Sequence, residues 1–317
     1  MKSEQIKLSA ILPNYNCAAF LPRAVQSLLN QTEALDEIII VDDGSTDNSI
    51  EVIQALMSAH PTIRFYRHEK NQGVNPALNT GIQHAIGDYI LLSAADDVYS
   101  PKIAELTKQV IRQHPSVGLV CGDAMVQRYD MKAPFYRMLP YPANTLITPD
   151  VFKRLARKSF ACFNSGGSMF INRELIMRVG MIQPALRWHG DWLLYFICAF
   201  KQGFYYINEV FIQIDIRKAG YCENGRQNNN VQSQVMLDTV RIIDKVYPEC
   251  WEDFKAAALM PHYALRYIPL FLSDPVACRF VTARLVWKML INNKIMTRIG
   301  RWFPYSVILR TRKLLKA

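Results

Sequence analysis

Short apolar runs alternate with helix-like patterns along the first two thirds of the chain. The runs at 8–12, 37–41, 63–66 and 89–92 have the length of buried strands, and apolar residues between them recur at helical spacing. Strands that alternate with helices at this spacing are typical of a parallel sheet with right-handed crossovers. The pattern therefore predicts an α/β protein with a doubly wound sheet.

The later part of the chain has weaker patterns. Further strands are expected at 117–121, 169–171, 205–207 and 210–212, with helices at 103–111, 174–179 and 188–200. Four prolines within 127–160 indicate an irregular connection followed by a short helix, and 217–234 is polar enough for a flexible loop or boundary. We predict an α/β domain over 1–220 and a helical C-terminal region over 221–317.

Composition restricts the class of protein. Half of the 317 residues are hydrophobic, which excludes a disordered chain. Seven scattered cysteines without a CxxC pair favour reduced thiols over a disulfide framework or a zinc site. No signal-like stretch or run of about 18 apolar residues is present. These features predict a cytoplasmic protein without a transmembrane helix.

The net charge of +10 is concentrated at the C-terminal end. Residues 275–317 hold ten Lys and Arg and no acid, while the rest of the chain balances 27 bases with 27 acids. Apolar residues interleave with these bases, and Trp287, Trp302, Phe303 and Tyr305 add aromatic anchors. A basic amphipathic helix of this kind suits an anionic membrane surface, here the inner face of the cell membrane. Packing against the rest of the protein is the alternative, and the apolar content disfavours nucleic acid.

Acidic residues follow two of the expected strands. Asp42 and Asp43 end the second strand, and Asp96 and Asp97 follow the fourth. Open α/β sheets bind ligands at such strand ends, where carboxylates can hold Mg²⁺ or Mn²⁺ against substrate phosphates. Taken alone, the doublet at 96–97 would equally fit acids placed against a helix dipole.

Several motifs together carry a family resemblance. They are Pro13-Asn14-Tyr15-Asn16, Val41-Asp42-Asp43-Gly44-Ser45-Thr46-Asp47, Asn71-Gln72-Gly73, Asn79-Thr80-Gly81, Gly87-Asp88-Tyr89-Ile90 and Ala95-Asp96-Asp97. With them, the chain resembles inverting nucleotide-sugar glycosyltransferases of family 2 over residues 6–215, most strongly up to 101. The resemblance implies the GT-A fold, a Rossmann-like and mostly parallel doubly wound sheet, here with a helical C-terminal extension.

The resemblance also implies a nucleotide site. Pro13, Tyr15, Asp43 and Ala95 would line it, with Tyr15 against the base and Asp43 accepting a hydrogen bond from it. Alternatively, Asp42 and Asp43 cap the following helix together with Ser45.

A metal site is implied next to the nucleotide. Asp96 matches the metal-binding acid of the family's DxD motif and would bind Mn²⁺ or Mg²⁺, with Asp97 as a less certain neighbour. The first acid of that motif is Ala94 here, and Leu78 stands where many relatives have Arg. The first change removes a ribose contact and the second a phosphate contact.

Asp191 matches the catalytic base of the family, which takes the proton of the acceptor hydroxyl during direct displacement. A helix N-cap is the alternative role for Asp191. Gly166 and Gly167 lie where the acceptor loop would fall, although a simple turn fits them equally. Arg217 stands near the place of a diphosphate-binding residue, and a solvated loop charge is the alternative.

The function implied is transfer from a nucleoside-diphosphate sugar, with a UDP-sugar favoured, to a glycan or lipid-linked acceptor in bacterial surface polysaccharide assembly. Two alternatives stay open: transfer onto polyprenyl phosphate, and a nucleotide-binding scaffold without turnover. The missing acid at Ala94 and the missing base at Leu78 motivate the scaffold. A dinucleotide-binding dehydrogenase is disfavoured because no GxGxxG follows the first strand.

Overall fold

The computed structural model describes residues 5–158, 161–164, 167–218 and 220–299. The chain divides into two compact units, one comprising residues 1–155 and 160–224 and the other 156–159 and 225–317. Each unit is described by itself.

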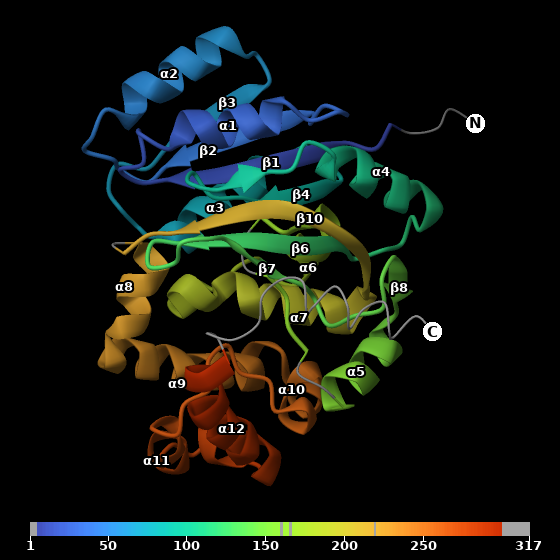
Figure 1. The fold of residues 1–317 in the computed structure, drawn as a ribbon, viewed down its shortest axis with the longest axis vertical. Coiled ribbons are helices and arrows are strands. Elements are labelled where there is room, and N and C mark those ends of the chain that lie inside the picture. Colours follow the sequence, from blue (N-terminus) through green and yellow to red (C-terminus); the bar gives the residue numbers. More distant parts are fainter. Residues whose placement is uncertain (1–4, 159–160, 165–166, 219, 300–317) are drawn as a thin grey trace. The chain divides into compact units, whose positions relative to one another are not determined.

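The first unit is built on one ten-stranded sheet (Figure 1). Its main path runs β3-β2-β1-β4-β9-β6-β10-β5, with β7 beside β6 and β8 beside β10. The strands are β1 Leu8–Asn14, β2 Glu37–Asp42, β3 Ile63–Arg67, β4 Tyr89–Leu92, β5 Val98–Tyr99, β6 Leu119–Arg128, β7 Phe135–Arg137, β8 Thr145–Ile147, β9 Met169–Asn172 and β10 Phe204–Ile216.

The strands β1 to β4 are parallel, and this brings their polar ends together. In the register Asn14 lies beside Asp42, and Asp42 lies beside Arg67. The strands β6 and β10 are also parallel, whereas β9 runs antiparallel between β4 and β6. The predicted mostly parallel α/β sheet is confirmed.

Helices cover both faces of the sheet. Alternate residues of β1 pack into a core with α1, α2 and α4, while Ile11 points the other way, against Gly81 of α3. Gly81 is needed there, because a Cβ would lie 2.3 Å from the Ile11 side chain. The helices of this unit are α1 Leu21–Leu29, α2 Ser49–Ala59, α3 Val74–His84, α4 Ile103–Gln113, α5 Pro149–Lys158, α6 Arg173–Arg178, α7 Gly190–Gln202 and α8 Tyr221–Gln227, with α5 and α8 each extending past a unit boundary.

Two sequence-based expectations need correction. The strands expected at 205–207 and 210–212 are one strand, β10, whose pairing with β6 shifts register between Tyr206 and Ile212. The flexible loop predicted at 217–234 is wrong, because this segment holds α8 and the start of α9, Asn229–Val246. Its Asn and Gln residues obscured the helix, although the Asn228 side chain accepts the Val231 N–H as an N-cap. The alternative of a boundary agrees with the division between the two units, which falls at 224–225.

The second unit is helical. Its core gathers buried apolar residues from four helices and a 3₁₀ turn: Val235, Met236, Val240, Ile243, Phe254, Tyr267, Phe271, Phe280, Leu285 and Met289. The helices are α9, α10 Trp251–Ala257, α11 Tyr267–Leu272 and α12 Ala283–Ile299, and α9 contacts α11. Among the described residues, every helix is too short or too polar to cross a lipid bilayer.

Lys288 is a buried base in this unit. It is 3% exposed, and its Nζ donates to the Ala257 carbonyl at 2.7 Å. Burial, and secondarily the nearby Arg284, lower the pKa of Lys288 from 10.5 to about 8.

This shift predicts a pH-dependent stability. Between pH 8 and 10.5 the unfolded chain binds more protons at Lys288 than the folded chain does. The free energy of unfolding should therefore rise with pH across that window, by at most about 3 kcal/mol. Urea unfolding followed by circular dichroism measures it.

Two variants isolate this contribution. Lys288→Met should remove the rise, whereas Lys245→Met, at an exposed position of α9, should keep it. Parallel pH curves for the wild type and Lys288→Met would contradict a lowered pKa at Lys288.

Candidate active site

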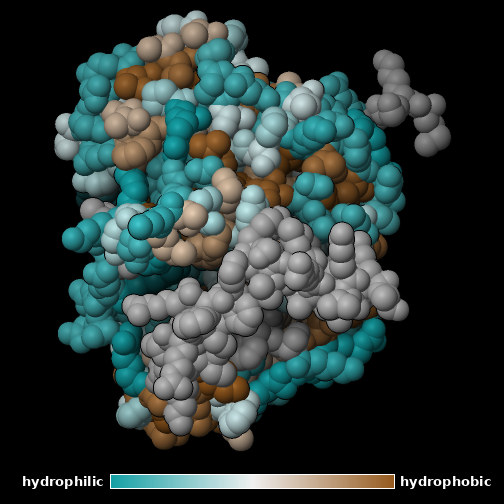
Figure 2. Space-filling model, in the orientation of Figure 1, coloured by the Kyte–Doolittle hydropathy of each residue, from teal (hydrophilic) through white to brown (hydrophobic). Residues whose placement is uncertain are grey.

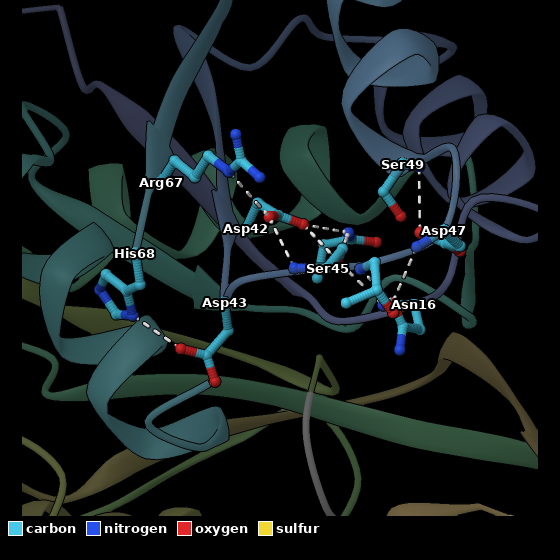
Figure 3. Close-up of polar contacts among 10 residues, drawn as sticks. Asn16, Asp42, Asp43, Ser45, Asp47, Ser49, Arg67 and His68 are labelled. Atoms are coloured by element: carbon cyan, nitrogen blue, oxygen red, sulfur yellow. Dashed lines mark hydrogen bonds and ion pairs between the residues drawn. The ribbon is translucent and has the colours of Figure 1, made fainter. Parts of the chain in front are cut away.

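Asp42 fixes the turn that follows β2. Its side chain is fully buried and accepts hydrogen bonds from the Ser45 hydroxyl at 2.5 Å, the Ser45 N–H at 3.0 Å and the Asn14 amide at 2.8 Å (Figure 3). Arg67, from the end of β3, lies 3.8 Å from the same carboxylate. Asp42 therefore holds three strand ends together.

Asn16 and Asp47 join the loops after β1 and β2. The Asn16 side-chain oxygen accepts the N–H groups of Thr46 and Asp47 at 2.8 and 3.2 Å. Asp47 in turn accepts the Ala18 N–H at 3.1 Å. Asn16 has a φ of 51°, which this residue type tolerates and which these contacts fix.

Asp43 has a different role from Asp42. Its buried carboxylate accepts the Gly73 N–H at 2.7 Å, the Gln72 N–H at 3.0 Å and a hydrogen bond with His68 Nδ1 at 2.7 Å. Figure 3 shows His68 and Asp43 facing each other. Asp42 thus holds the turn with Ser45, whereas Asp43 holds the loop between β3 and α3. The alternative that these residues cap the following helix is wrong, because the N-cap position of α2 is Asn48.

Gly44 allows that loop to come close. Its φ is 74°, and a Cβ on it would lie 2.8 Å from the carbonyl carbon of Lys70. Backbone cannot move away as a flexible side chain can, so the contact requires glycine. The loops after β1, β2 and β3 therefore form one rigid group.

Two of the three other residues predicted at the nucleotide site border this group. Pro13 is half-buried in β1, and Tyr15 follows it with 44% of its surface exposed. The Asn14 carbonyl accepts the Asp43 N–H at 2.8 Å, which fixes Tyr15 next to the Asp43 loop. Ala95 is 3% exposed and belongs to the hydrophobic core, so its side chain is not open to a ligand.

Asp96 is paired with Arg217. The guanidinium donates to Asp96 Oδ2 at 2.5 Å and stacks on the Phe20 ring with its Cζ 4.1 Å from the ring centroid. The Cys17 thiol also bonds to Arg217, and burial raises the pKa of that thiol. Both Phe20 and Cys17 lie in the β1–α1 loop. Arg217 is therefore seated in the site, and the alternative of a solvated loop charge is wrong.

A second arginine strengthens the same junction. Arg23 of α1 donates to Asp215 Oδ2 at 2.5 Å and to the Asp96 carbonyl at 3.2 Å. The Asp97 carboxylate accepts the backbone N–H of Asp215, and β5 pairs with β10 nearby. The Asp96–Asp97 segment is thereby held by the end of β10.

Asp97 is the buried member of the doublet, 8% exposed. Burial, and next the charge of Asp96, raise the pKa of Asp97 well above its ordinary value. Asp96 remains more accessible, with 26% of its side chain exposed. Of the two acids, Asp96 is the one that can meet a ligand.

The donor set fits a hard cation bound through its substrate. Mg²⁺ and Mn²⁺ commonly use one or two carboxylates together with substrate phosphates. Arg217 engages Oδ2 of Asp96, and 26% of the Asp96 side chain remains exposed, so a hard carboxylate ligand is accessible there. Within the described ranges, three or more His, Cys, Asp or Glu side chains do not gather as a metal cage.

Gly167 fits tightly against the acidic segment. Its φ is 64°, and a Cβ would lie 2.7 Å from the Tyr99 hydroxyl and from Ile212. The Tyr99 oxygen accepts the Ala94 N–H at 2.9 Å. The glycine is thus explained by packing against protein. Gly166, the other residue predicted in this loop, lies outside the described residues.

Asp191 lies in the first turn of α7, where His189 takes the N-cap position. Its Oδ1 accepts the N–H of Trp192 at 2.8 Å. The preceding Gly190 packs against Asn75 in the first turn of α3, where a Cβ would lie 2.7 Å from the Asn75 amide nitrogen. The absence of a second acid at 190 thus has a steric cause, because a longer side chain would collide with α3.

Leu78 and Ala94 have structural explanations of different kinds. Leu78 is 6% exposed, so an arginine there would need a buried charge. Ala94 is half-buried, and its side chain supplies no polar group to the site.

Sequence reasoning missed four residues of the site: Cys17, Phe20, Arg23 and His68. Arg23 and Asp215 are 192 positions apart, so no local pattern indicates the pair. For His68 the only signal was its position directly after the strand Ile63–Arg67.

Comparisons with known proteins identify a family for this chain. The family model described as Glycosyl transferase family 2 matches residues 9–180. A glycosyltransferase of Nostoc sp. is 40% identical over 115 residues, 36% of each chain, and the Escherichia coli chondroitin synthase is 37% identical over 113 residues, 36% of this chain and 16% of the synthase. The chain thus matches about a third or less of the length of these relatives.

Longer matches are more distant. The cholesterol galactosyltransferase of Borreliella burgdorferi is 23% identical over 301 residues, 88% of this chain and 81% of that one. Residues 1–349 of S. aureus TarS with UDP-GlcNAc superpose with a TM-score of 0.61 at 14% identity, covering 90% and 79% of the two chains. A Pyrobaculum calidifontis mannosyltransferase with GDP-Man and Mn²⁺ gives 0.55 at 20% identity, covering 99% and 81%. The predicted GT-A fold is confirmed.

The contacts of Asp43 predict how its loss would act. Asp43→Ala leaves the Gln72 and Gly73 N–H groups without their acceptor, so the free energy of unfolding should fall by about 1–3 kcal/mol. Hydrogen exchange should accelerate in the peptide over 68–73 while a peptide from α2 stays protected. Unchanged exchange at 68–73 would mean that Asp43 does not hold this loop.

Proposed function

The chain belongs to glycosyl transferase family 2, and we propose that it is a metal-dependent inverting enzyme that uses a nucleoside-diphosphate sugar, preferably a UDP-sugar. The observation that carries this proposal is the junction of Asp96 and Arg217 beside the loops of Asp43 and Tyr15. It offers a flat ring, hydrogen-bonding polar edges, a hard carboxylate oxygen and a fixed cation in one place. A nucleoside diphosphate has parts that match each of these groups.

The nucleotide base is proposed to lie against Tyr15, with Asp43 accepting a hydrogen bond from its edge. The 44% exposure of the Tyr15 ring supports this placement, and the three contacts of Asp43 to the loop at 68–73 would pre-organise its carboxylate. Structural neighbours of this fold are described with UDP-GlcNAc and with GDP-Man. A screen of nucleotide sugars as donors tests the proposed preference for uridine.

Asp96 is proposed to hold Mn²⁺ or Mg²⁺ together with the donor diphosphate. When bound, such a cation stabilises the negative charge that develops on the departing nucleoside diphosphate. Arg217 lies within hydrogen-bonding distance of Asp96, so its guanidinium could contact the same phosphates without a large movement. Phe20 would keep it oriented through the stacked ring contact.

Asp191 is proposed as the catalytic base. Inversion is a single displacement, in which the acceptor hydroxyl attacks the anomeric carbon as a carboxylate removes its proton. Asp191 lies beside Gly190, which packs on the first turn of α3, and that turn follows the Gly73 held by Asp43. The base is thus connected to the nucleotide loops through short contacts.

The acceptor is proposed to be a glycan or a lipid-linked acceptor in surface polysaccharide biosynthesis. A relative named chondroitin synthase supports a glycan, and one named cholesterol galactosyltransferase supports a lipid. Polyprenyl phosphate as acceptor is one alternative, and a nucleotide-binding scaffold is the other. The location we propose, the inner face of an anionic membrane, depends on the C-terminal unit and not on the donor site.

Two substitutions test the proposed chemistry. Asp191→Asn should lower kcat by roughly 10²–10⁴ while leaving the Kd for UDP unchanged, because the base acts only on the acceptor. Asp96→Ala should abolish the gain in UDP affinity that Mn²⁺ provides. Product formation from a panel of nucleotide sugars and calorimetric titration of UDP measure the two effects.

A matched control is Asp88→Asn, at the opposite end of β4 from Asp96, which should leave both quantities unchanged. Full turnover in Asp191→Asn would refute its role as base. UDP binding without turnover of any donor in the wild type would favour the scaffold.

A further inference from the structure

The helix α12 has apolar residues on two sides, and only one side serves the fold. Leu285 and Met289 are fully buried in the core of the second unit, and Lys288 is buried with them. On the other side Trp287 is 62% exposed and Leu290 is 38% exposed. The buried side corrects the simple interpretation of an amphipathic helix, because that apolar stripe is already used within the protein.

The exposed apolar residues lie on one side of α12. Trp287 and Leu290 are three positions apart, a spacing that returns to the same side of an α-helix. We call this pair the outer face. The sequence that follows it carries bases at positions 294 and 298.

The surface around α12 is apolar as well. Leu272, at the end of α11, is 59% exposed. Figure 2 shows hydrophobic residues at the surface over α11 and α12, at the lower end of the view. Single exposed apolar residues are common on protein surfaces. Leu272, Trp287 and Leu290 therefore indicate a binding surface only together with the charge of the neighbouring sequence.

The charge of this region identifies the partner. Residues 275–317 hold ten bases and no acid. A second copy of the same face would bring like charges together, which opposes self-association. Nucleic acid would match the bases but not an exposed Trp and Leu. An anionic lipid surface matches both the exposed apolar pair and the bases, since tryptophan favours the membrane interface and bases are attracted to lipid phosphates.

We propose that the outer face of α12 is the lipid-contacting surface, with Trp287 and Leu290 entering the interface of an anionic bilayer and the excess of bases in the C-terminal sequence attracting its headgroups. This deepens the location in the proposed function and does not depend on the transfer reaction. Lys288 is excluded from the contact, because it is buried in the core of its own unit.

Flotation of the full chain with vesicles tests this inference. Vesicles of phosphatidylcholine with phosphatidylglycerol should bind the wild type, vesicles of phosphatidylcholine alone should bind it far less, and high salt should release it. Trp287→Glu should weaken vesicle binding by about 10-fold or more, since it removes the ring that enters the bilayer and adds an acid. Reversing the charge at Lys294 and Arg298 should weaken it by roughly 5-fold or more per site.

Matched controls separate this effect from unfolding. Ile86→Glu changes a similarly exposed apolar residue of the first unit, at 55% exposure against 62% for Trp287, and should bind as the wild type does. Circular dichroism should show that the Trp287→Glu variant keeps its helix content. UDP affinity should be unchanged in that variant, so failure here would be distinct from failure of the proposed enzyme.

Two results would overturn the inference. One is binding that is equal for neutral and anionic vesicles or unaffected by Trp287→Glu. The other is a wild-type dimer that Trp287→Glu converts to a monomer with vesicle binding unchanged, which would make the outer face a contact between copies.

Discussion

The candidate site depends on the pairing of Asp96 with Arg217, which are separated by 121 positions in the chain. Asp97 next to them is buried, and two adjacent carboxylates repel unless a cation is close. Arg217 supplies that cation, and Phe20 and Cys17 hold it in place. The pair therefore does two things: it stabilises an acidic strand end, and it fixes the orientation of the Asp96 carboxylate.

Other contacts between distant segments explain why the Asp96–Arg217 pair can form. Arg23 joins α1 to Asp215 and to the Asp96 carbonyl, and β5 pairs with β10. Elsewhere in the site, Asp42 holds the turn after β2, and Asp43 holds the loop after β3. Exposed ion pairs such as that of Arg23 contribute little to stability by themselves, so their value here is in geometry.

The sequence predicted what depends on local pattern. Apolar runs predicted the positions of β1 to β4. Acidic residues at strand ends identified Asp43 and Asp96 as candidate site residues. It could not predict the pairing of Arg23 with Asp215 or the stacking of Arg217 on Phe20, because these contacts follow from tertiary packing. Polar composition misled at 217–234, where capping by Asn228 outweighed weak helix propensity. Steric packing at Gly190 and burial at Leu78 account for two departures from the family pattern that sequence alone left unexplained.

A crystal structure of the chain with UDP and Mn²⁺, with anomalous diffraction to locate the metal, tests the donor site most directly. We predict a manganese peak at Asp96 that also contacts the diphosphate, with uracil against Tyr15 and within hydrogen-bonding distance of Asp43. Manganese bound away from Asp96, or uracil bound away from Tyr15 and Asp43, would contradict the central claim that these strand ends form the donor site.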